Sequence, residues 1–107
     1  MIRIVNLRNY QLKENELLIK VDRNSVLGNP FPMYNKTEEE RNRVCNQYEI
    51  YFKKIINNKD LKENQNFMNE LRRIYLLAKK QDITLGCWCF PKRCHSETIK
   101  AFLEQFL

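Results

Sequence analysis

Residues 83–95 carry the sequence ITLGCWCFPKRCH, in which a short apolar run leads into a loop. The run as far as Cys89 has the length and the apolar character of a buried strand. Pro91 fixes the backbone angle that follows and removes an amide donor, so it marks a shaped loop. Apolar residues then recur at helical spacing from Ile99 to Phe106, which predicts a final helix that begins between Cys94 and Glu97.

Regular structure is also predicted for most of the chain before this stretch. Apolar and β-branched residues at 2–7 and 17–21 predict two short strands. The segment between them is shorter than the dozen or so residues of a helical crossover, so an antiparallel pairing is expected if these strands are neighbours. Apolar stripes predict two helices, one at 37–56, where Thr37 and Glu40 have the spacing of a capping box, and one at 67–80.

The order of these elements, β-β-α-α-β-α, predicts the fold class. It indicates a small single α/β domain over residues 1–107, in which three helices cover a mixed sheet of short strands. Both glycines and all three prolines fall within residues 22–34, here called the first loop, or residues 86–96, the second loop. Open α/β sheets bind their ligands in loops at strand ends, so the chemistry is expected in these two segments.

The composition narrows the class of protein and of partner. No apolar run approaches the roughly 20 residues that span a bilayer, and the N-terminus lacks a signal-peptide pattern, so we expect a cytoplasmic protein without a membrane partner. The four cysteines are therefore expected to be thiols and not disulfides. The formal net charge of +6 favours an anionic partner, although the cations are scattered along the chain. An exposed apolar helix stripe would also allow a homodimer.

Four side chains that can ligate a metal or act as nucleophiles lie close together in the second loop: Cys87, Cys89, Cys94 and His95. One interpretation is a tetrahedral zinc site, although Cys-x-Cys is not the usual zinc-knuckle spacing. A second is a helix start that binds an anion without a cofactor, with Cys94 as catalytic nucleophile and His95 as acid or base. A third is packing, in which the cysteines are small core residues and His95 forms a cap.

The first loop offers groups that suit a nucleotide-like ligand. Arg23 suits a phosphate or a carboxylate, Asn29 both donates and accepts hydrogen bonds, and Phe31 offers a face for stacking. The alternative is a rigid turn, in which Asp22 pairs with Arg23 and Phe31 fills the core. Arg41, from the following helix, either lines the same pocket or lies on an exposed helix face.

Three short motifs recur together in this chain: VNLR at residues 5–8, GNPF at 28–31, and LGCWC at 85–89 followed by Pro91 and Cys94-His95. In this order and spacing they resemble a bacterial and phage family, domain of unknown function 4326. The family commonly has Gly-Asp where this chain has Ser96-Glu97. The resemblance spans most of the chain and implies a shared pocket without implying a reaction. The residues it assigns to that pocket are Asn6, Arg8, Arg23, Gly28, Asn29, Phe31, Cys87, Cys89, Cys94 and His95.

These observations predict a pocket for a small anionic ligand derived from a nucleotide or nucleoside. In a phage setting such a pocket would sequester a host nucleotide signal. One alternative is a hydrolase or transferase that acts on a nucleotide-derived substrate through Cys94 and His95 or a bound metal. Another is a zinc-stabilised nucleic-acid-binding protein. The sequence does not decide whether the protein is an enzyme.

Overall fold

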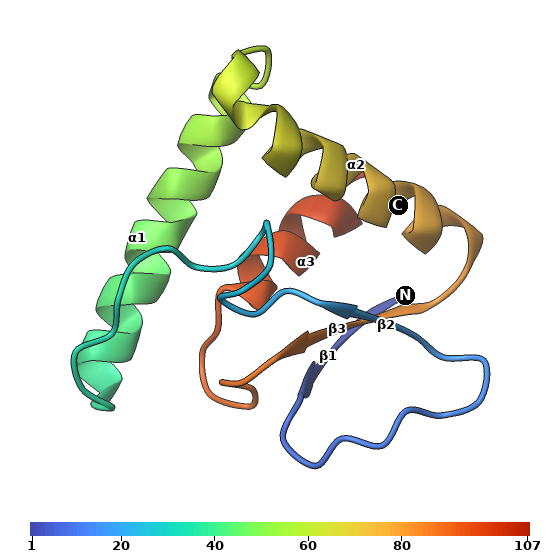
Figure 1. Ribbon diagram of the computed structural model, residues 1–107, viewed down its shortest axis with the longest axis horizontal. Coiled ribbons are helices and arrows are strands. Elements are labelled where there is room, and N and C mark those ends of the chain that lie inside the picture. The colour runs from blue at the N-terminus through green and yellow to red at the C-terminus, as the bar shows by residue number, and fades with distance from the viewer.

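The computed structural model describes residues 1–107 and contains one sheet of three strands (Figure 1). Strands β1 (Ile2–Asn6), β2 (Leu17–Lys20) and β3 (Ile83–Cys87) lie in the order β1-β3-β2, and both pairings are parallel. Every residue of β3 is buried, because this strand lies between the other two and has both faces covered. The predicted α/β class is confirmed.

The sheet is parallel throughout, whereas the sequence predicted a mixed sheet. The two N-terminal strands are not neighbours, because β3 lies between them. Residues 7–16 therefore carry the chain back from the carboxyl end of β1 to the amino end of β2, so that the two strands run in the same direction (Figure 1). Glu16 anchors this return, since its carboxylate accepts hydrogen bonds from Arg3 at 2.9 Å and from Thr84 at 2.8 Å.

Three helices and one short 3₁₀ turn complete the fold: α1 (Glu38–Asn57), η1 (Lys62–Asn64), α2 (Gln65–Lys80) and α3 (Ser96–Glu104). In Figure 1, α1 and α2 diverge from the turn that joins them, and α3 lies between these two helices and the sheet. The predicted helices are confirmed, and α3 begins within the predicted range. None of the helices is long and apolar enough to cross a membrane.

Aromatic side chains join the three helices into one core. The ring of Phe52 on α1 meets Phe67 on α2 and Phe102 on α3, with centroids 5.5 and 5.2 Å apart. The same helix α3 buries Ile99 and Leu103 and packs against β1 and β3. Edge-on aromatic pairs of this kind add to the stabilisation that comes from burying the rings. The core therefore fixes the position of α1 relative to α3 and the sheet.

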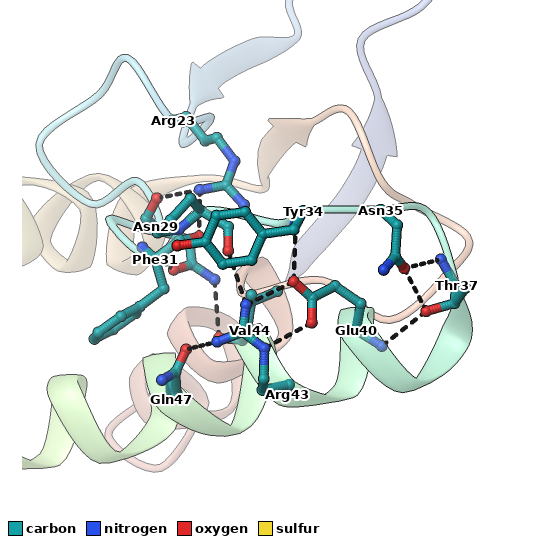
Figure 2. A network of polar contacts seen from close by, with 11 residues as sticks. Arg23, Asn29, Phe31, Tyr34, Asn35, Thr37, Glu40, Arg43, Val44 and Gln47 are labelled. Carbon is teal, nitrogen blue, oxygen red and sulfur yellow. Dashed lines mark hydrogen bonds and ion pairs between the residues drawn. The ribbon is translucent and has the colours of Figure 1, made fainter.

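Thr37 caps the N-terminus of α1 as predicted, but the second hydrogen bond expected for a capping box has a different acceptor. The amide of Glu40 donates to the Thr37 hydroxyl at 3.2 Å, as a capping box requires. The reciprocal bond is absent, because the Glu40 carboxylate instead accepts from the Tyr34 amide and the Arg43 guanidinium. The Asn35 side chain replaces Glu40 as the acceptor and accepts a hydrogen bond from the Thr37 amide at 3.0 Å (Figure 2). These bonds tie the end of the first loop to α1.

A buried hydroxyl connects α1 to the middle of the first loop. Tyr48 is fully buried, and its hydroxyl donates to the Leu27 carbonyl at 2.7 Å. We expect Tyr48→Phe to lower the free energy of unfolding by about 1–2 kcal/mol, because the buried carbonyl loses its partner. Chemical denaturation measures this loss. Tyr51→Phe is the matched control, since the Tyr51 hydroxyl makes no such bond, and an equal loss in both variants would contradict the assigned role.

Candidate functional site

The two loops meet around a cavity of about 140 Å³ that also borders α1. It lies where β2 and β3 end, the position at which parallel sheets present their ligand sites. From the first loop and α1 the cavity is lined by Asp22, Arg23, Asn24, Asn29, Met33, Arg41, Val44 and Cys45. From the second loop it is lined by Trp88, Cys89, Arg93, Cys94 and His95.

Arg23 and Asn29 shape the first loop through hydrogen bonds within the protein. The Arg23 guanidinium donates from one nitrogen to the carbonyls of Asn29 at 2.8 Å and Phe31 at 2.7 Å. The buried Asn29 amide donates to the Val44 carbonyl of α1 at 3.1 Å and accepts from the Phe31 amide at 2.9 Å (Figure 2). Both side chains line the cavity, but these bonds already explain why the loop needs them.

Phe31 and Asp22 both contact residues outside the first loop. The half-buried Phe31 ring lies outside the cavity and packs edge-on against Tyr51, with ring centroids 5.7 Å apart. Asp22 accepts a hydrogen bond from the Trp88 indole at 3.1 Å, and it forms no ion pair with Arg23. The indole bond therefore joins the first loop to the second across the cavity mouth.

Asn6 holds the second loop in place without lining the cavity. Its side-chain amide donates to the carbonyls of Trp88 at 3.2 Å and Phe90 at 2.7 Å, and it accepts from the Arg8 amide at 2.8 Å. The Arg8 side chain is exposed and lies outside the cavity. Gly28 also lies outside it, packed closely against the backbone of residues 22–23. Only part of the predicted ligand-binding set is therefore brought together.

Three thiols of the second loop interact, and their environments differ. Cys87 and Cys94 are buried, whereas Cys89 is half-buried on the cavity wall. Hydrogen bonds to Cys87 and Cys89, together with burial, raise the pKa of the Cys94 thiol, which therefore stays protonated. A hydrogen bond from Cys94, aided by the charge of Arg41, lowers the pKa of Cys89 to about 6. This arrangement favours Cys89 over Cys94 as a reactive thiol.

His95 is held as a neutral ring with a defined tautomer. Its Nε2 atom faces the Val21 carbonyl, which can only accept, so Nε2 carries the proton. Its Nδ1 atom lies 3.6 Å from the Cys94 sulfur. The imidazole packs against the Tyr48 ring, with ring centroids 5.0 Å apart. Burial lowers the pKa of His95. With both nitrogens facing protein groups, the ring orients its neighbours and offers no free atom to a ligand.

The geometry does not support the zinc alternative. In this structure no group of three or more His, Cys, Asp or Glu side chains is arranged to hold a metal ion. The Nε2 atom of His95 is directed at a backbone carbonyl and would have to leave it to bind a metal.

Two arginines on the cavity wall carry charges that no carboxylate compensates. Neither Arg23 nor Arg41 forms an ion pair, whereas Arg93 pairs with Glu49 at 3.1 Å. Asp22 is the one carboxylate that lines the cavity. The cavity wall is therefore electropositive, and Arg41 is the cation with the fewest bonds to the protein.

Sequence reasoning missed several wall residues that α1 contributes. Val44 and Cys45 follow Arg41 at helical spacing, so all three occupy one face of α1. That spacing was the available signal, but it does not say which part of the fold the helix face meets. Trp88 was missed as well: it lines the cavity and is 59% exposed.

Comparison with known proteins gives one match. Neither the curated proteins nor the solved structures contain a significant match to this chain. One family model, described as Domain of unknown function (DUF4326), matches residues 5–105 and so covers both loops, all three helices and every strand except the first three residues of β1. The chain therefore belongs to the family Domain of unknown function (DUF4326).

Proposed function

We propose that the cavity binds a small anionic ligand derived from a nucleotide or nucleoside. The observation that carries the proposal is the Arg41 guanidinium, which forms no ion pair with a carboxylate and lies on the wall where the two loops meet. A guanidinium whose charge is not already paired is suited to a phosphate or carboxylate. Arg23, from the first loop, adds a second positive charge to the lining of the cavity.

The size of the cavity and its mouth support a ligand that is only partly enclosed. A volume of about 140 Å³ is smaller than the roughly 300 Å³ at which pockets begin to enclose a drug-sized molecule. It suits one end of a nucleotide, such as a sugar phosphate. The exposed Trp88 ring at the mouth offers a face on which a base can stack.

Asp22 favours a sugar-bearing anion over a bare one. Its carboxylate lines the cavity and uses one oxygen to accept from Trp88, which leaves the other oxygen for further donors. A carboxylate repels an anion but accepts hydrogen bonds from sugar hydroxyls. Arginine and carboxylate side by side therefore match a ligand with both an anionic group and hydroxyls. In a phage setting, tight binding without reaction would sequester a host nucleotide signal.

Titration calorimetry with AMP, cyclic AMP and ADP-ribose tests this proposal. We expect at least one of these to bind, and Arg41→Gln to weaken that binding by about tenfold or more, because a charge-assisted hydrogen bond is lost. Arg72→Gln is the matched control, since it removes the same charge from an exposed position on α2. Native mass spectrometry of the purified protein would also reveal a ligand that is retained from the expression host.

Two outcomes would contradict the proposal. If none of the three nucleotides gives a signal in calorimetry or in a thermal-shift assay, the proposal loses its main support. Equal weakening by Arg41→Gln and Arg72→Gln would show that general charge, and not the cavity, attracts the ligand. Binding of nucleic acid with a steep dependence on salt would favour the nucleic-acid alternative instead.

A further inference from the structure

The chain has four free cysteines, and only one of them combines access with a cavity. Cys45, Cys87 and Cys94 are buried, with 1–4% of their surface exposed. Cys89 is half-buried and lines the cavity, so it is the thiol that a bound ligand can approach most directly. Its position follows from Asn6, whose two bonds to the second loop fix the backbone on either side of this residue.

Two neighbours stabilise negative charge on the Cys89 sulfur. Hydrogen bonding with Cys94, which keeps its proton, and the positive charge of Arg41 on α1 both lower the pKa of Cys89. Cys94 also lowers the pKa of Cys87, to about 5, but Cys87 is buried and does not line the cavity, whereas Cys89 lines it together with Arg41. A thiolate that faces a cavity beside a cation is the arrangement of a nucleophile.

We infer that Cys89 is a nucleophile, and that it attacks an electrophilic carbon of an anionic ligand whose anionic group is bound by Arg41. In this step the sulfur lone pair forms an S–C bond, the bond from that carbon to its leaving group breaks, and the leaving group departs with the electron pair. No oxidant or reductant is needed. The inference rests on the proposed function, because both place the anion at Arg41, and it adds covalent chemistry to that site.

Alkylation by iodoacetate and iodoacetamide tests this directly. The two reagents deliver the same carbon and the same leaving group, iodide, but only iodoacetate carries a negative charge. We expect peptide mass spectrometry to find Cys89 alkylated first. We expect its ratio of iodoacetate rate to iodoacetamide rate to exceed that of free glutathione by about tenfold, because Arg41 binds the carboxylate.

Variants separate the role of Arg41 from that of the thiol. Arg41→Gln should lower this rate ratio about tenfold, toward that of glutathione, while Arg72→Gln leaves it unchanged. Cys89→Ser should abolish the rapid label and leave only the slow labelling of buried thiols. Cys94→Ala should raise the pH at which Cys89 begins to react, because the thiolate loses its hydrogen-bond donor.

Two results would overturn the inference. One is earlier labelling of Cys45, Cys87 or Cys94 than of Cys89. The other is a rate ratio at Cys89 that equals that of glutathione and does not respond to Arg41→Gln. Calorimetry of nucleotide binding to Cys89→Ser distinguishes the proposed function from the proposed nucleophile. Nucleotide binding without a reactive Cys89 would leave the proposed function standing alone, and a selective thiol without nucleotide binding would contradict the ligand class only.

Discussion

Gly28→Ala is expected to lower the free energy of unfolding by about 3 kcal/mol and to open the mouth of the cavity. A Cβ atom at this position would lie 2.3 Å from the Asp22 carbonyl oxygen and 2.8 Å from the Arg23 Cα atom. Both are backbone atoms and cannot move aside alone, so the first loop must shift as a unit. Because Asp22 holds the Trp88 indole, this shift is expected to break the contact between the loops.

The other glycine of the chain provides the matched control. At Gly86 a Cβ atom would lie 2.5 Å from Leu7 Cδ2 and 3.2 Å from Leu18 Cδ1, which are ends of flexible side chains. We therefore expect Gly86→Ala to cost only about 1 kcal/mol. Chemical denaturation measures both values, and acrylamide quenching of Trp88, the only tryptophan, reports the cavity mouth. Equal losses of unfolding free energy in the two variants, or unchanged quenching of Trp88 in Gly28→Ala, would show that the close packing of Gly28 against residues 22–23 does not determine the loop conformation.

The helices were predictable because their signals are local. Thr37 and Glu40 mark the start of α1 by spacing alone, and apolar stripes at helical period mark where α1 and α2 bury their faces. The order of the strands was not predictable in this way. Whether β1 lies beside β2 or β3 depends on contacts with residues 83–87, which are distant in sequence, and the pattern of residues 2–20 does not indicate them.

The location of the site was easier to predict than the roles of its individual residues. Glycine and proline cluster where the backbone needs special geometry, so both loops stood out before any contact was known. The role of Arg23 could not be predicted in this way, because a guanidinium binds backbone carbonyls as readily as phosphates. Here it binds the carbonyls of the first loop. Similarly, Cys89 and Cys94 look alike in sequence, and only burial and the approach of Arg41 distinguish them.

The stability of the protein is expected to fall as the pH drops below about 6.5, because of His95. Burial holds the pKa of this side chain below its ordinary value of 6.5. Between the lowered pKa and 6.5, the unfolded chain binds a proton that the folded protein excludes. The stabilisation is therefore complete above pH 6.5 and is lost as the pH falls, by up to about 1.4 kcal/mol per pH unit. Between pH 6.5 and 5 this amounts to at most about 2 kcal/mol.

The test is clean because His95 is the only histidine of the chain. Urea denaturation at a series of pH values should give a smaller slope against pH in His95→Gln than in the wild type. Cys89 and Cys87, whose pKa values are lowered to about 6 and about 5, also lose their contributions to stability as the pH falls from 9, so only the difference between the two proteins is assigned to His95. An NMR titration gives an independent reading from the single imidazole. A midpoint at or above 6.5 would show that the ring is not held neutral, and the bond to the Val21 carbonyl would then no longer define its tautomer.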